Sequence, residues 1–172
     1  MIAVVITLVT YSVVLAEKAV DSFLHSDKTY QSVTVTKVIT ADSFLLDSGE
    51  KIKMIGLKAP EKPPKKKIEF DKYGFPIKYE DPRTTLGERA YGFTKEALEG
   101  RQVRLEFDYE KKSSDFETLA YVFLPDQTFV NAEVLRQGYA DLKIVPPNKK
   151  YLDILQKAYQ EARREKRGIH GE

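Results

Sequence analysis

Residues Val38–Glu61, which read VITADSFLLDSGEKIKMIGLKAPE, decide the fold. From Val33 onward, apolar and polar residues alternate, which is the period of a half-buried strand. The segment Asp47-Ser48-Gly49 is a turn signal between two such runs. Pro60 ends the third run because proline cannot donate to a strand ladder. The stretch therefore predicts three consecutive strands, at Val33–Ile39, Ser43–Asp47 and Lys51–Leu57.

Downstream of this stretch the sequence predicts a long loop, two further strands and three helices. The loop is Glu61–Thr85, which is rich in Pro, Lys, Tyr and Asp and has no period. Strands are expected at Gln102–Tyr109 and Leu119–Leu124, and helices at Leu86–Leu98, Phe129–Gln137 and Lys150–Lys166. Five strands in meander order, with a helix between the third and the fourth, indicate an α+β protein: a five-stranded OB-fold barrel with three helices.

Composition limits the chemistry that this chain can perform. Its 172 residues, 42% hydrophobic and 31% charged, suit one globular domain with attachments. The absence of cysteine excludes disulfides, zinc–thiolate sites and a cysteine nucleophile. The two histidines, His25 and His170, lie before the domain and near the chain end, which argues against a histidine triad or a multi-histidine metal site. A net charge of +2 is too small to indicate a nucleic-acid partner by itself.

The N-terminus carries a separate signal. Ile2–Leu15 contains no charge and is shorter than a membrane span of about 20 residues. It suits the apolar region of a secretory signal, with a cleavage site after Ala16, although the usual basic residues before it are missing. We expect residues 1–16 to be a signal peptide or a short membrane anchor, 17–32 a linker, 33–169 the domain and 170–172 a tail. The protein would then be secreted, periplasmic or tethered to the membrane, and the alternative is a buried strand or helix.

Five blocks of the chain resemble the staphylococcal-nuclease-like (thermonuclease) family. VITADSF is similar to the family's Val-x-Asp-Gly-Asp-Thr pattern, and KMIGLKAPE is similar to Arg-Leu-x-Gly-Ile-Asp-Ala-Pro-Glu. LGERAYGFTKEAL resembles the family's Gly-x-x-Ala-x-x-x-Thr helix. LAYVFLPDQTFVNAEVLRQGYA and EARREKRGI resemble its later blocks. Because the five blocks occur in the family's order from Val33 to Ile169, the resemblance implies the family's OB-fold domain.

The resemblance also implies a chemistry, which is the hydrolysis of nucleic-acid phosphodiester bonds. In the family, two aspartates hold a calcium ion that bridges to the phosphate. A glutamate orients or deprotonates the attacking water. Two arginines grip the phosphate and stabilise the transition state with their planar forks.

Transferred residue by residue, this chemistry is only partly retained. The first metal-ligand aspartate is Asp42, but the second falls on Lys58. The glutamate is Glu61. The first arginine falls on Lys53 and the second on Glu117, and no Lys or Arg occurs between Ser113 and Leu135. A unit charge about 4 Å away, at an effective dielectric of about 20, contributes about 4 kcal/mol, so exchanging Asp for Lys disfavours a divalent ion by several kcal/mol.

Structural interpretations of these residues stay open. Asp42 can be a turn residue, Glu61 a solvated one, and Lys53 and Lys58 ordinary exposed lysines. Alternatively, the Lys58 ammonium takes the place of the metal between Asp42 and Glu61. The turn at residues 144–147 offers no ring for stacking. Basic side chains from elsewhere could complete the site, and the candidates are Arg83, Arg89 and Arg104.

Two functional hypotheses follow. The first is an exported, degenerate nuclease that needs no cofactor and acts as a binding or interaction module. The second is an active metal-dependent endonuclease that uses calcium. The partner is nucleic acid, bound weakly, or another protein, and a monomer is expected. A loop cluster beside aromatic residues could contact phosphates and bases, although acidic neighbours dilute its charge. Its basic members are Lys62, Lys65, Lys66 and Lys67.

Overall fold

The structure is a computed structural model, and it describes residues 30–60, 72–75 and 85–171. The N-terminal segment 1–29, Glu61 and the basic cluster at 62–67 lie outside the described residues. The strands are β1 (Val33–Thr40), β2 (Ser43–Leu46), β3 (Lys51–Met54), β4 (Gly56–Lys58), β5 (Gln102–Glu106), β6 (Thr118–Phe123) and β7 (Asp141–Lys143). The helices are α2 (Leu86–Leu98), α3 (Val130–Arg136), α4 (Leu152–Arg164) and a final 3-10 turn, η1 (Gly168–His170).

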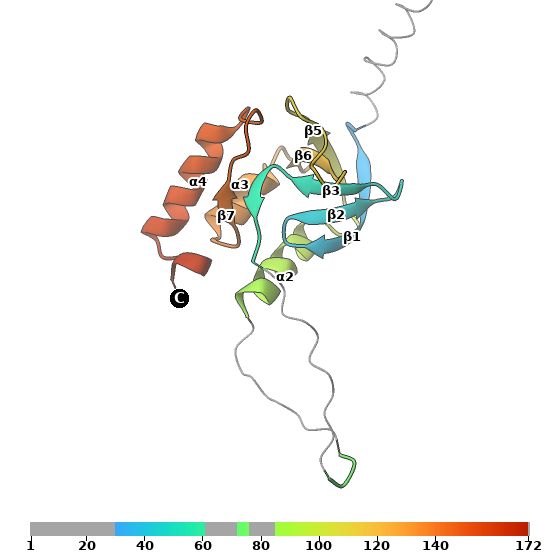
Figure 1. The fold of residues 1–172 in the computed structure, drawn as a ribbon, viewed down its shortest axis with the longest axis vertical. Coiled ribbons are helices and arrows are strands. Elements are labelled where there is room, and N and C mark those ends of the chain that lie inside the picture. The colour runs from blue at the N-terminus through green and yellow to red at the C-terminus, as the bar shows by residue number, and fades with distance from the viewer. Residues whose placement is uncertain (1–29, 61–71, 76–84, 172) are drawn as a thin grey trace, which may run out of the picture.

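Five of the strands close into a barrel in the order β1-β2-β3-β6-β5. The β3–β6 pair is parallel and the other pairs are antiparallel. The inward faces fill the barrel with fully buried side chains, among them Val35, Phe44, Ile52 and Val122. Figure 1 shows α2 at one end of the barrel and α3 with α4 beside it. The expected α+β fold, a five-stranded OB-type barrel with three helices, is therefore confirmed.

The third predicted strand differs from the expectation because it divides at Ile55. Gly56 has a φ of +85°, which L side chains rarely adopt, and the chain changes direction there. After this break, β4 leaves the barrel and pairs antiparallel with β7, a strand that the sequence analysis missed. The buried Asn131 holds the break, since its amide donates to the Ile55 carbonyl and accepts from the Val122 amide, both at 2.9 Å.

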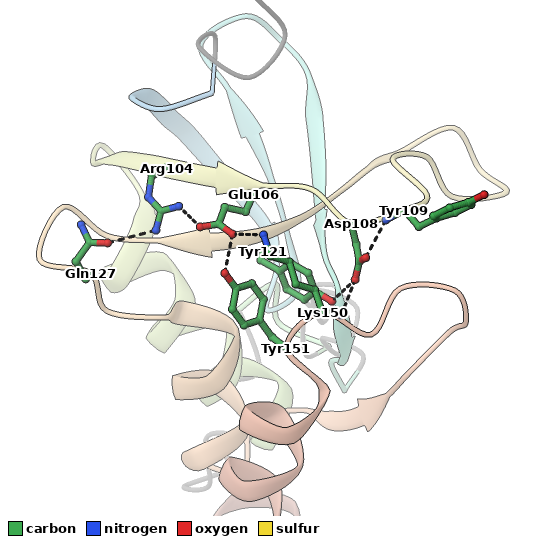
Figure 2. A network of polar contacts seen from close by, with 8 residues as sticks. All are labelled: Arg104, Glu106, Asp108, Tyr109, Tyr121, Gln127, Lys150 and Tyr151. Atoms are coloured by element: carbon green, nitrogen blue, oxygen red, sulfur yellow. Dashed lines mark hydrogen bonds and ion pairs between the residues drawn. The ribbon is translucent and has the colours of Figure 1, made fainter. Parts of the chain in front are cut away.

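The fourth predicted strand is also shorter than expected, because β5 ends at Glu106 rather than at Tyr109. A polar network begins where it ends, and Figure 2 shows its members between β5, β6 and the start of α4. Glu106 accepts hydrogen bonds from the Lys150 ammonium at 2.7 Å and the Tyr151 hydroxyl at 2.6 Å, and it pairs with Arg104. These contacts hold the start of α4 against the barrel. Because Lys150 and Tyr151 lie 44 and 45 residues after Glu106, no local sequence pattern predicts them.

Candidate functional site: a lysine-lined pocket

A pocket of about 340 Å³ opens where the β1–β2 turn, β3, β4, β7 and the residue just before β6 come together. We call it the lysine pocket. Its charged lining residues are Lys51, Lys53, Lys58, Lys143, Asp42 and Glu117. A second hollow of about 430 Å³ shares Lys53, Leu57, Glu117 and Lys143 with it and extends along residues 110–115. Two stretches of the chain that lie far apart in sequence, β3 with β4 and β7, thus place four lysine side chains around one opening.

Asp42 lies in the wall of the lysine pocket and is held by neighbours on every side. The Thr94 hydroxyl of α2 donates to the preceding Ala41 carbonyl at 2.9 Å, which fixes the turn. The Asp42 carboxylate, only 8% exposed, accepts hydrogen bonds from the Thr40 hydroxyl at 2.7 Å and the Ala59 amide at 3.3 Å. It also forms an ion pair with the Lys53 ammonium at 3.4 Å. Both carboxylate oxygens of Asp42 therefore already have partners from the protein.

Glu117 points into the lysine pocket, where the resemblance implies an arginine. Its carboxylate pairs with the Lys51 ammonium at 2.5 Å, and its side chain is 14% exposed. Lys51 and Lys53 share one face of β3, because the alternate residues Ile52 and Met54 are buried in the barrel. The negative charge of Glu117 is thus locally neutralised by a lysine that the sequence analysis did not single out.

Lys58 and Lys143 complete the cationic lining. Both are exposed, and within the described part of the chain neither forms an ion pair closer than 4 Å. The ammonium that forms the ion pair with Asp42 belongs to Lys53, and Lys58 lines the same pocket. Glu61, the residue expected on the other side of Lys58, lies outside the described residues.

Among the described residues, no arginine lines the lysine pocket or the adjoining hollow. Arg104 lies in the network of Figure 2, where it pairs with Glu106, bonds Gln127 at 3.3 Å and covers the Phe123 ring at 4.3 Å. Arg89 is exposed on α2 and lines neither hollow, and Arg83 lies outside the described residues. Across residues 30–60, 72–75 and 85–171, the charged lining of the lysine pocket therefore offers ammonium groups and no guanidinium.

Comparison with known proteins identifies the scaffold. The profile of the family described as "Staphylococcal nuclease homologue" matches residues 51–171. The chain is 33% identical over 142 residues to a thermonuclease of Staphylococcus intermedius, covering 81% of this chain and 76% of that protein. It is 31% identical over 147 residues to a thermonuclease of Staphylococcus hyicus, covering 84% and 78%. The chain belongs to the staphylococcal nuclease family.

The metal implied by the staphylococcal nuclease family does not fit the side chains that the structure describes. Calcium takes six to eight oxygen ligands, most strongly carboxylates. Among the described residues, no group of three or more His, Asp or Glu side chains is placed to hold an ion. Asp42 is engaged with Thr40, Ala59 and Lys53, and Glu117 is engaged with Lys51. The pocket therefore presents positive charge where the family implies a cation.

Of the residues selected from sequence, the structure brings Asp42, Lys53, Lys58 and Glu117 together in one pocket. Lys51 and Lys143 were missed as members of it. Lys51 could have been found from the period of two along β3, which puts it on the same face as Lys53. Lys143 carried no local signal, because β7 has only three residues and Lys143 pairs with Gly56, which lies 87 positions earlier in the chain.

Proposed function

We propose that this protein is a degenerate nuclease that has lost calcium-dependent hydrolysis and acts as a binding module. One observation carries the proposal: the Asp42 carboxylate is paired with Lys53, and the second ligand position is Lys58. A carboxylate already neutralised by an ammonium has little charge left for a divalent ion. With two further cationic groups on the rim of the pocket, calcium would be repelled rather than attracted.

The metal ligand and both phosphate-binding arginines that hydrolysis needs are replaced together in this chain. Lys53 replaces a bidentate fork by a point charge. Glu117 puts a carboxylate where a phosphate would have to lie, although Lys51 neutralises part of it. Since metal ligands and phosphate clamps act on one transition state, a surviving Glu61 would not compensate for their combined loss.

An active metal-dependent endonuclease is the second candidate. It is favoured by the two relatives, which are named thermonucleases, and by Asp42, which remains buried in the wall of the pocket. In this case nucleic acid would be the substrate and calcium the cofactor, and Lys53 would have to leave Asp42 when the ion binds.

A plasmid-digestion assay with calcium, magnesium or manganese separates the two candidates. We expect no cleavage above background from the unmodified protein. The triple variant Lys58→Asp, Lys53→Arg, Glu117→Arg should gain calcium-dependent cleavage, because it restores one ligand and both clamps. Cutting by the unmodified protein that is abolished by Glu61→Gln would overturn the proposal and establish the second candidate.

Export is part of the proposal and rests on the uncharged run Ile2–Leu15. Within the described residues, no helix has the length and apolarity needed to cross a membrane. N-terminal sequencing of the protein from its own host should find Glu17 as the first residue. An intact Met1 in a membrane fraction would show an anchor, and an intact Met1 in soluble cell extract would contradict export.

A further inference from the structure

We propose that one end of the domain docks on a zwitterionic phospholipid bilayer, into which Tyr109, Phe116 and Val145 insert. This end is formed by the β5–β6 loop and the β7–α4 loop, residues 107–117 and 144–149, and we call it the docking face. It would act whether or not the chain cuts nucleic acid, so it lies beyond the proposed function.

Exposed apolar side chains gather on the docking face. Among the described residues, Tyr109 and Phe116 have the two most exposed large apolar side chains, at 83% and 86%, and Val145 is 55% exposed. All three border the hollow of about 430 Å³, which is lined by Val145, by Glu110 and by both neighbours of Phe116. Single exposed apolar residues are ordinary, whereas a group of them marks a contact with a protein or a membrane.

Hydrogen bonds tie the two loops of the docking face together. The buried Asn148 side chain accepts from the Glu110 amide and donates to the Glu110 carbonyl, both at 2.8 Å. The Asp108 carboxylate accepts from the Lys150 amide at 2.8 Å. Figure 2 shows Tyr109 beyond this joint, with its ring pointing away from the network. A fixed scaffold therefore presents the apolar side chains to the surroundings.

The backbone at Phe116 presents the ring at a cost. Its φ of +60° is a genuine outlier for a bulky residue. The Ser113 hydroxyl accepts hydrogen bonds from the amides of Asp115 and Glu117 at 3.2 Å, and the Ser113 carbonyl accepts from the Phe116 amide at 3.0 Å, which holds this turn. Since the ring stays almost fully in water, packing within the described domain does not offset the cost, whereas insertion into an apolar phase would.

The charges of the docking face suit a zwitterionic lipid. Its exposed ionic side chains without an ion pair among the described residues are two acids and two lysines: Glu110, Asp115, Lys111 and Lys149. Phosphatidylcholine carries a phosphate and a quaternary ammonium, so it offers a partner to both signs. An anionic bilayer or another polyanion would be repelled by the two acids about as strongly as it is attracted by the two lysines.

The chain enters the described domain beside the docking face. The carbonyl of Tyr30, the first described residue, accepts from the Leu105 amide at 2.9 Å, and its ring meets the Phe107 ring at a centroid distance of 4.8 Å. Figure 1 shows the start of β1 and both loops at the upper end of the domain, with α2 at its lower end. The uncharged run Ile2–Leu15 precedes Tyr30 in the chain. A bilayer that holds this run would therefore lie nearest to the docking face.

A bilayer suits these side chains better than a protein partner does. Tyr109 and Phe116 protrude separately, and among the described residues neither packs against another aromatic ring. A protein partner must match such a surface in shape, whereas a fluid bilayer accepts separate side chains. Tyrosine is typical of the membrane–water interface, because its ring lies in the apolar boundary while its hydroxyl stays among the headgroups.

The test places a fluorescent probe on the docking face of the full chain. The chain has no cysteine, so Ser114→Cys offers a single site for the environment-sensitive dye NBD, and Glu96→Cys on the exposed side of α2 offers the matched control. Each labelled protein is mixed with phosphatidylcholine vesicles whose acyl chains are brominated and quench the dye. At about 1 mM lipid, we expect quenching at position 114 to be about three times that at position 96, or more. Anionic lipid added to the vesicles should not increase it.

Phe116→Gly with Tyr109→Ser tests the inserted side chains. Glycine accepts a φ of +60°, so this variant should resist urea about as well as the unmodified protein. Quenching at position 114 should nevertheless fall to the level at position 96, because two apolar side chains no longer enter the bilayer. Glu110→Gln with Lys111→Gln removes one charge of each sign from the same loop, and it should change the quenching by less than about a third.

Four results would overturn the inference. The first three are no quenching at either position, equal quenching at both, and full quenching in the Phe116→Gly, Tyr109→Ser variant. The fourth is a change in dye emission that rises with protein concentration without vesicles, which would assign the docking face to a second copy of the chain. These measurements use neither nucleic acid nor calcium, so their failure would leave the proposed loss of hydrolysis standing.

Discussion

Replacing Glu106 by glutamine should destabilise the fold in a manner that depends on pH. Glu106 is the acceptor at the centre of the network in Figure 2, where Arg104, Lys150 and Tyr151 converge on its carboxylate. Burial raises the pKa of Glu106, but the hydrogen bonds from Lys150, Tyr151 and Arg104 outweigh it and lower the pKa to about 2. Glutamine keeps the shape of the side chain and removes the charge that holds the three donors.

The loss of stability expected for Glu106→Gln follows from the lowered pKa of Glu106. A fall from the ordinary 4.5 to about 2 corresponds to about 3 kcal/mol of stability. The side chain is 21% exposed, so solvent screening reduces the expected loss to about 2 kcal/mol. Because the folded pKa lies below the unfolded one, this contribution is fully present above about pH 4.5 and is lost as the pH falls toward 2.

The assay is urea unfolding followed by far-ultraviolet circular dichroism, at pH 7 and at pH 3. We expect Glu106→Gln to be less stable than the unmodified protein by about 2 kcal/mol at pH 7, and by about half of that at pH 3. The matched control is Glu96→Gln, an exposed position on α2, which should change stability by less than about 0.5 kcal/mol. If the two proteins differ in unfolding free energy by the same amount at both pH values, or do not differ at pH 7, this reasoning is refuted.

Two further predictions concern buried polar groups. Asn131→Ala leaves the Ile55 carbonyl and the Val122 amide without their hydrogen-bond partner. We expect the free energy of unfolding, measured with urea, to fall by about 3 kcal/mol. A fall below about 1 kcal/mol would contradict the role of Asn131 at the strand break. The second prediction concerns His170. Burial, with the charge of a nearby arginine, lowers the pKa of His170. Its ring contacts the Tyr159 ring with a centroid distance of 4.9 Å, and its Nε2 is buried without a hydrogen-bond partner among the described residues. Its contribution to stability is thus present above about pH 6.5 and lost below it, so His170→Phe should flatten the stability profile between pH 7 and 5, and an unchanged profile would contradict this.

Much of the fold could be predicted from sequence, because its signals are local. The alternation along β1 and the turn at Asp47-Ser48-Gly49, where Gly49 has a φ of +82°, specify consecutive antiparallel strands. The start of α2 is equally local, since Thr85 and Glu88 form a capping box. The division of the third strand at Ile55 could not be predicted, because it depends on Asn131, which comes 76 residues later.

The candidate site, like the fold, could be predicted from sequence only in part. Asp42, Lys53, Lys58 and Glu117 could be selected because the family's motifs cover their positions. Their pairing could not, because it is decided in three dimensions: Lys51 reaches Glu117 across 66 residues of sequence, and Lys53 rather than Lys58 reaches Asp42. The positive φ of +60° at the exposed Phe116 also leaves no trace in composition or period.

Calorimetric titration of the protein with calcium tests the central claim most directly, because it measures whether a lysine-lined pocket still accepts the ion. We expect no binding at micromolar calcium in the unmodified protein, and stronger binding after Lys58→Asp together with Lys53→Arg, since a second carboxylate ligand is restored. Micromolar affinity in the unmodified protein, lost on Asp42→Asn, would show that Asp42 releases Lys53 to hold calcium. That result would contradict the claim that the charges of the lysine pocket repel calcium.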